Sequence, residues 1–134
     1  MLRPASYRLV SVVALIVLAM FVVLNAQTPS IPKYDKSSEA RVKGVIDDVK
    51  TGADGIVHLA LNTDKGALDV VIAPEKFLKE MEITFAKGDA LEVLGSKVAA
   101  GEASLFLARE VTRNGEIMMM RDDSGKPVWV GWPK

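Results

Sequence analysis

From residue 40 onward the chain consists of short runs of β-forming residues separated by turn signals, and this pattern restricts it to a fold built on a sheet. Two of the runs, IVHLALN at 56–62 and ALDVVIA at 67–73, alternate between two kinds of residue. Alternation places every second side chain on the same face of a strand, so each run has one buried side. The expected buried residues are Val57, Leu59 and Leu61 in the first run and Leu68, Val70 and Ile72 in the second.

Three further runs supply the other strands of the domain. They are RVKGVIDDVK at 41–50, ALEVLGSKV at 90–98 and SLFLAREV at 104–111. Gly44 and Gly95 indicate a bend or bulge within two of these strands. The inward residues expected in the last two strands are Leu91 and Val93, then Leu105, Leu107 and Val111.

One short helix is predicted between the third and fourth strands. Pro74 opens the segment PEKFLKEMEI, in which Phe77, Leu78 and Met81 recur at helical spacing. Three strands, a helix and two strands is the order of the OB-fold, a five-stranded barrel. An SH3-like barrel or a simple meander could give a similar succession of strand and turn signals. We therefore predict a mostly-β, OB-like five-stranded barrel domain over residues 40–134, with one short helix and a C-terminal hairpin extension.

The hairpin extension is indicated by Asn114-Gly115, because a type I′ turn needs two residues that tolerate positive φ. Residues 116–121 then return as a strand with Met118 and Met120 on one side. Exported methionine-rich segments can bind Cu(I) through soft thioethers. Two thioethers without another soft ligand make a poor site, so we expect both methionines to pack in the core.

The end of the chain combines a turn with a last extended segment. The turn is DDSGKP at 122–127, and VWVGW at 128–132 is expected to pack Trp129 against the barrel. Asp122 and Asp123 lack the D-x-D-x-D-G spacing of a calcium loop, so they are interpreted as solvated turn residues.

The beginning of the chain predicts one transmembrane helix within residues 1–26, because it contains a long apolar run with no polar face. Arg3 and Arg8 precede the run, and no charge follows it until Lys33. The positive-inside rule then leaves the N-terminus in the cytoplasm and exports the remainder. We expect residues 7–26 to lie in the lipid bilayer.

This segment is predicted to stay attached as a signal anchor in the bacterial inner membrane, because Leu24 is bulky where a cleavage site prefers a small residue. The alternative is cleavage after Ala26 and secretion to the periplasm. Residues 27–39 contain two prolines with serine, threonine and charge, which predicts a linker of extended chain. The domain that follows is extracytoplasmic in either case.

Composition excludes several kinds of site. The absence of cysteine excludes disulfides, thiolate metal sites and CxxCH haem attachment, and a single histidine disfavours a conventional transition-metal centre. Residues 35–134 carry 14 basic and 17 acidic groups, a net charge of −3, which does not suit a phosphate backbone. No GxSxG, Walker or GxGxxG motif is present. We predict no catalytic residue, cofactor, metal or nucleic-acid partner.

The candidate binding surface is the outer face of the second and third strands with its bordering loops, where OB-folds usually take ligands. The outward residues there are His58, Ala60, Asn62, Asp69 and Val71. We predict a non-catalytic binding or assembly module whose partner is another envelope protein. The alternative is a metal- or cofactor-handling periplasmic protein that uses Met118 and Met120 with His58 or the aspartates. Oligonucleotide binding is a third, weaker interpretation.

Two stretches of the sequence resemble a group of small bacterial exported or membrane-anchored domains that includes the C-terminal domain of the magnetosome proteins MamS and MamX. They are GIVHLALNTDKGALDVVIAPEKFL at 55–78 and AREVTRNGEIMMMRDDSGKPVW at 108–129. The resemblance lies in turn and core residues, so it implies a fold and a location and carries over no catalytic residue. MamX-like proteins carry CxxCH haem motifs that this chain lacks, so no electron-transfer role is implied. The chain is also loosely similar to the exported bacterial OB-fold stress-tolerance family.

Overall fold

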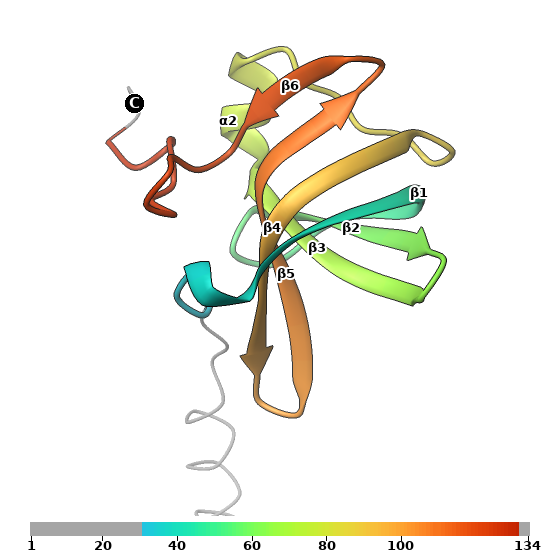
Figure 1. The fold of residues 1–134 in the computed structure, drawn as a ribbon. Coiled ribbons are helices and arrows are strands. Elements are labelled where there is room, and N and C mark those ends of the chain that lie inside the picture. Colours follow the sequence, from blue (N-terminus) through green and yellow to red (C-terminus); the bar gives the residue numbers. More distant parts are fainter. Residues whose placement is uncertain (1–30, 132–134) are drawn as a thin grey trace, which may run out of the picture. The chain divides into compact units, whose positions relative to one another are not determined.

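The computed structural model describes residues 31–131, in which five strands close into a barrel with one short helix and a sixth strand at its edge (Figure 1). The helix is α2, Glu75–Glu80, and a 3-10 turn, η1, occupies Lys36–Ser38. The strands are β1 Glu39–Thr51, β2 Ile56–Thr63, β3 Gly66–Pro74, β4 Ala90–Ala100, β5 Ala103–Arg113 and β6 Glu116–Met119.

The strands follow one another across the sheet in the order β3-β2-β1-β4-β5-β6. All these neighbours are antiparallel, and a short parallel pairing between β3 and β5 closes the barrel. With α2 between β3 and β4, this is the OB-like arrangement, and it confirms the predicted barrel with one helix.

Among residues 31–131 no helix is long and apolar enough to cross a membrane. The transmembrane helix predicted at 7–26 lies outside the described residues.

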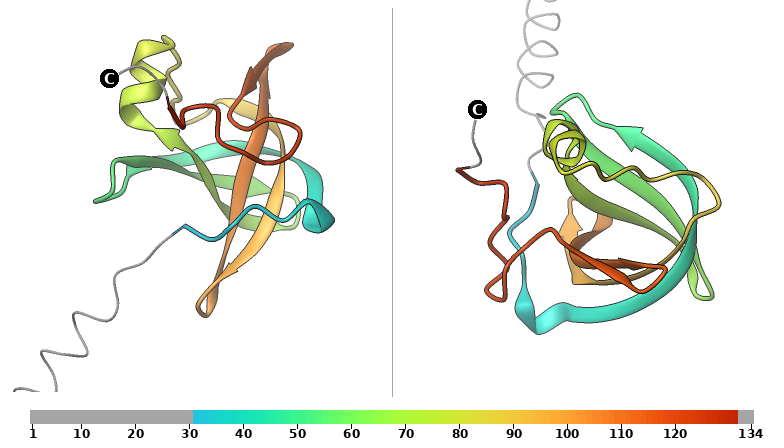
Figure 2. Two further views of the ribbon diagram at one scale, coloured as in Figure 1. Left: turned by 90° about the vertical axis from the view of Figure 1, so that its left-hand side faces the viewer. Right: turned by 90° about the horizontal axis from the view of Figure 1, so that it is seen from above.

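Gly44 allows β1 to pair with two neighbouring strands. Residues 39–45 pair with β4 and residues 44–51 pair with β2, so β1 curves round the barrel (Figure 2). A Cβ atom at Gly44 would collide with the carbonyl oxygen of Asn62. Only glycine lets the two backbones approach this closely.

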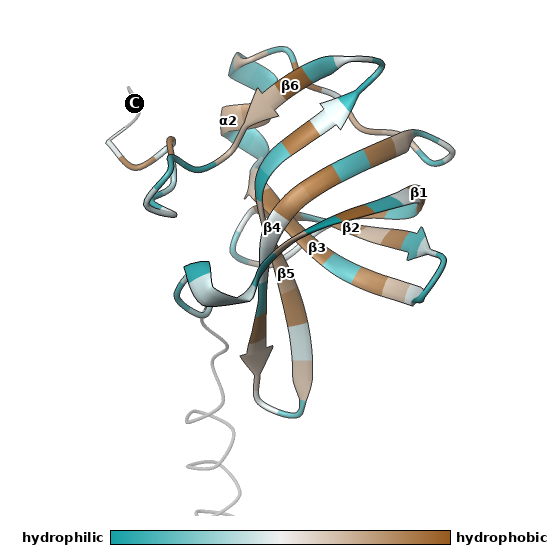
Figure 3. Ribbon diagram, in the orientation of Figure 1, coloured by the Kyte–Doolittle hydropathy of each residue, from teal (hydrophilic) through white to brown (hydrophobic). Residues whose placement is uncertain are grey.

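The barrel interior holds the inward side chains of all five strands. Apolar and polar residues alternate along the strands, which Figure 3 shows as bands of colour. The predicted inward residues of β2, β3 and β4 all pack in or against this core. They are Val57, Leu59, Leu61, Leu68, Val70, Ile72, Leu91 and Val93.

β5 contains a bulge that the alternation did not predict. The register with β4 shifts between Leu94 and Gly95, so Arg109 of β5 has no partner residue in β4. A Cβ atom at Gly95 would collide with the carbonyl oxygen of Leu107, so the predicted bend at this glycine is confirmed. The extra residue reverses the alternation on the two sides of the bulge.

The bulge makes one prediction about the core wrong. Phe106 and Ala108 join Val111 in the core, whereas Leu107 is buried outside that core cluster. We expected Leu105 and Leu107 to share a face with Val111. An unbroken period of two cannot describe a strand in which one residue is inserted.

The helix α2 packs against the barrel through Phe77 and Leu78, both of which are buried in the core as predicted. Pro74 occupies the N-cap, one residue before the first helical position at which it was expected. The prediction that Met81 joins the buried stripe is wrong. Met81 is the C-cap residue and 46% exposed, because the helix already ends at Glu80.

The predicted hairpin after β5 is confirmed, with positive φ angles of 53° at Asn114 and 81° at Gly115. Met118 and Met120 lie in the core, as the packing interpretation predicted. β6 is shorter than expected, since regular pairing with β5 ends at Met119.

The expectation of an extended segment at 128–132 is wrong for its described part, because residues 128–131 form turns. Arg121 and Pro127 pair as an isolated bridge, and the Val128 N–H donates to the carbonyl of Met120 over 3.1 Å. These bonds close the loop before another strand can form. Trp129 packs against the core as predicted, with its ring centre 6.0 Å from that of Phe77.

The segment before β1 also contacts the barrel. The backbone N–H of Asp35 donates to the Ser96 hydroxyl over 3.0 Å, and that hydroxyl donates to the Asp35 carbonyl over 2.7 Å. Tyr34 lies against Gly125 and donates a hydrogen bond of 2.5 Å to Glu39. The C-terminal part of the predicted linker, which the structure describes, therefore packs against the domain.

Candidate binding face

The outer side of β2 and β3 presents the side chains that the core does not use. Because Leu59 and Leu61 point inward, His58 and Ala60 point outward on β2. Ala60 pairs with Asp69 across the two strands, while His58 pairs with Val71. His58 and Asp69 are therefore diagonal neighbours on one face, a separation that long side chains can bridge.

His58 and Asp69 form the one polar side-chain bridge across this face that the structure describes between β2 and β3. The imidazole Nδ1 lies 2.8 Å from Oδ1 of Asp69. The His58 side chain is 26% exposed and that of Asp69 is 51% exposed, so water reaches both groups. With Nδ1 engaged by the carboxylate, Nε2 is left available to a ligand.

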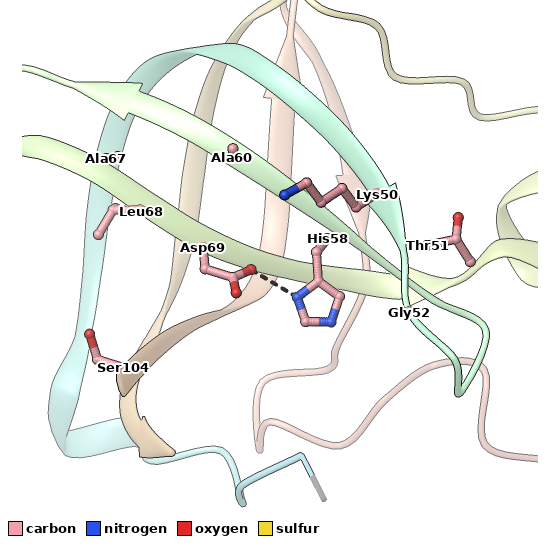
Figure 4. A pocket seen from close by; sticks show the side chains of 9 residues that line it. All are labelled: Lys50, Thr51, Gly52, His58, Ala60, Ala67, Leu68, Asp69 and Ser104. Atoms are coloured by element: carbon pink, nitrogen blue, oxygen red, sulfur yellow. Dashed lines mark hydrogen bonds and ion pairs between the residues drawn. The ribbon is translucent and has the colours of Figure 1, made fainter. Parts of the chain in front are cut away.

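This pair lies in a hollow of about 610 Å³ on the outer face (Figure 4). The end of β1 and the following turn border it through Lys50, Thr51 and Gly52, and Ser104 borders it from the start of β5. The face itself contributes His58, Ala60, Ala67, Leu68 and Asp69. The hollow therefore brings together three of the five predicted surface positions, namely His58, Ala60 and Asp69.

The other two predicted positions lie elsewhere. Asn62 is exposed but belongs to a neighbouring hollow beside Lys43 and Asp64. Val71 is only 1% exposed, so its prediction as a surface position is wrong. It pairs with Leu107 where β3 and β5 close the barrel.

Val71 is one of a row of buried residues that pair with one another across neighbouring strands. Leu107 pairs in turn with Ser96 of β4, and both are fully buried. Asp35 lies over Ser96 through the two hydrogen bonds between them. The segment before β1 thus covers the outer surface at the end of this row. The alternating pattern of β3 alone could not predict this contact.

Four residues that border the hollow carry no individual signal in the sequence, namely Lys50, Thr51, Gly52 and Ser104. The only signal was that loops border the binding face of an OB-fold. The turn after β1 is positioned by local bonds, since the Gly52 N–H donates to the Ile56 carbonyl over 2.9 Å. Ser104 reaches the same hollow from a hairpin far along the chain.

The hollow contains a serine, a histidine and an aspartate, but they do not form a hydrolytic triad. In a triad the carboxylate holds Nδ1 while the nucleophile meets Nε2. Here Ser104 lies on the far side of Asp69 from the imidazole, as Figure 4 shows. The arrangement places hydrogen-bonding groups beside small apolar residues.

The candidate metal ligands are dispersed in the described part of the chain. Residues 31–131 contain no group of three or more His, Asp or Glu side chains that could hold a metal ion. Met118 and Met120 are 6% and 0% exposed in the core, whereas His58 lies on the outer face. The structure therefore does not bring the two thioethers together with the imidazole.

A family model described as the MamS/MamX magnetosome protein family matches residues 39–118, more than half of the chain. This range holds the whole barrel and stops within β6. No curated protein matches the sequence.

Several solved structures are similar to this chain at low sequence identity. Asparaginyl-tRNA synthetase from Pyrococcus horikoshii, complexed with asparaginyl-adenylate, has a TM-score of 0.47 and 14% identity over 63% of this chain. A complex of TiaS with an isoleucine tRNA and ATP has a TM-score of 0.46 and 16% identity over 63%. The S. pombe Stn1-Ten1 complex has a TM-score of 0.45 and 16% identity over 70%. The match covers 23%, 20% and 65% of those chains, respectively.

Proposed function

The chain belongs to the MamS/MamX magnetosome protein family, and we propose that it is a non-catalytic binding or assembly module of the bacterial envelope. In this proposal residues 1–26 anchor the protein in the inner membrane and the barrel stands outside the cytoplasm. The support for the anchor is the apolar run after Arg3 and Arg8, with no further charge until Lys33.

The observation that carries the binding role is the hollow on the outer face of β2 and β3. Beside the His58–Asp69 pair, the hollow is lined by the charged residue Lys50 and by Ser104. Groups of both charge signs beside small apolar residues suit the mixed polarity of a protein surface better than they suit a polyanion. The partner we propose is therefore another envelope protein.

A photo-crosslinking residue placed at Ala67 tests this function in intact cells. Ala67 is exposed and borders the hollow, so the full-length protein should give one discrete crosslinked product that mass spectrometry identifies. The matched control carries the same residue at Ala86, which is exposed in the connection between α2 and β4. Absence of a product at Ala67, or the same products from both positions, would contradict the proposed binding face.

A further inference from the structure

A second hollow, of about 880 Å³, lies at the open mouth of the barrel. It is bordered where β1 begins, where the β2–β3 turn lies and where β4 and β5 form their long hairpin. It shares Leu68 with the candidate binding face but otherwise has its own lining. Its volume falls within the range of small-molecule sites.

The floor of the mouth is apolar. Phe106 is a core residue, and Val42 and Leu68 are partly buried against the same core. The mouth is open because β1 pairs with β2 only from Gly44 onward. Val42 therefore has no neighbour on the β2 side, and its apolar surface stays accessible.

The rim of the mouth is basic although the domain is acidic. Four basic and two acidic side chains line the hollow, a local net charge of +2. Residues 31–131 as a whole carry 14 basic and 17 acidic groups, a net charge of −3. The basic residues are Arg41, Lys43, Lys65 and Lys97, and the acidic ones are Asp64 and Glu92.

These four cations differ from the arginines elsewhere in the barrel. Arg109 and Arg113 each pair with a carboxylate. Within the described residues none of the four mouth cations forms an ion pair. A net positive charge beside a low-dielectric floor attracts anions.

We propose that the barrel mouth binds a small amphipathic anion, with an apolar chain or ring on the floor and a single carboxylate at the rim. The floor of Val42, Leu68 and Phe106 takes the apolar part, and the surrounding ammonium and guanidinium groups take the anionic head. Binding of this kind weakens as salt screens the rim charges. The site is separate from the His58–Asp69 pair and does not depend on the proposed envelope partner.

Lysine footprinting with octanoate tests the proposal on the full-length protein in nanodiscs of zwitterionic lipid. Octanoate should slow acetylation of Lys43, Lys65 and Lys97, measured residue by residue by mass spectrometry, and leave Lys87 unchanged. Lys87 is exposed in the turn before β4 and serves as the internal control. Octanol should not protect the three lysines. Equal protection by octanol, or no protection by octanoate, would overturn the proposal.

A comparison of charge-reversal variants tests whether the basic residues of the rim bind the anion. Reversal of two rim charges in Lys65→Glu/Lys97→Glu should weaken octanoate binding about tenfold, because each change replaces attraction by repulsion at short range. Lys87→Glu should leave binding unchanged, and circular dichroism checks that all variants fold. His58→Ala should also leave it unchanged, which separates this site from the proposed partner face. Equal weakening by Lys87→Glu would refute the assignment.

Discussion

Arg121 lies with its guanidinium carbon 5.5 Å from the centre of the Tyr34 ring, and this contact joins the segment before β1 to the segment after β6. The same guanidinium lies 5.5 Å from the centre of the Trp129 ring. Both segments fall outside the residues matched by the family model. The two ends of the described domain therefore contact each other beside the barrel, which is the part that the family model matches.

Replacing Arg121 should destabilise the domain. Arg121→Ala removes the contacts with both rings and a 2.9 Å hydrogen bond to the Gly125 carbonyl, so we expect a loss of about 2 kcal/mol in the free energy of unfolding. Denaturant unfolding measures it, with Lys126→Ala at an exposed position as control. A change no larger than that of the control would contradict the role of the contact.

Arg121→Met should be milder than Arg121→Ala. The guanidinium is buried, its Nε has no hydrogen-bond partner, and desolvation lowers the pKa of the group. Both replacements remove this unsatisfied polar atom, but a methionine also keeps much of the packing that alanine loses. Unfolding of the two variants side by side gives the order. If methionine is the worse replacement, its side chain does not fit the space that the Arg121 side chain occupies.

The stability of the domain should fall at alkaline pH through Tyr34. Burial raises the pKa of Tyr34, and the hydrogen bond to Glu39 raises it further. The folded state then holds the phenolic proton more tightly than the unfolded state, so stability is fully present below pH about 10 and is lost as pH rises beyond it. Tyr34→Phe should show a flatter decline in melting temperature above this pH. An identical decline in both proteins would assign the effect to other groups.

Gly95→Ala should destabilise the barrel because the added methyl group meets the Leu107 carbonyl, which belongs to backbone and cannot move aside easily. We expect a cost of about 1–3 kcal/mol, measured by thermal unfolding. Ala99→Ser, at an exposed position on the same strand, is the control and should change stability little. A neutral Gly95→Ala would mean that the bulge at Arg109 relaxes.

The His58–Asp69 pair should matter for the proposed partner and little for the fold. A side-chain hydrogen bond that water reaches contributes about 1 kcal/mol, so His58→Ala and Asp69→Asn should unfold almost as the natural chain does. Both variants should nevertheless reduce the crosslinked product obtained from Ala67. Loss of stability with unchanged crosslinking would show that the pair has a structural role.

The predicted membrane topology can be checked with alkaline phosphatase fused after Lys134, because this enzyme is active only outside the cytoplasm. The fusion should be active in cells and remain in the membrane fraction after a high-salt wash. Recovery in the soluble periplasmic fraction would support cleavage after Ala26. An inactive fusion beside normal protein levels would contradict export.

Local sequence patterns determined most of the elements of this protein. Alternation located β2 and β3, Asn114-Gly115 located the hairpin, and the apolar spacing after Pro74 located α2. These features depend on side chains that are near neighbours along the chain, so a short window contains the physical cause. Of the candidate site, the same patterns could place only the outward residues His58, Ala60 and Asp69.

Tertiary structure decided what lies between elements that are distant in sequence. Pairing of β3 with β5 buried Val71, and one inserted residue at Arg109 turned Leu107 away from the core cluster. Lys50 and Ser104 border one hollow only because the barrel closes. A single strand shows its own period of two, but strand register and closure depend on backbone bonds with other segments, so only the complete fold determines which faces remain open to a ligand.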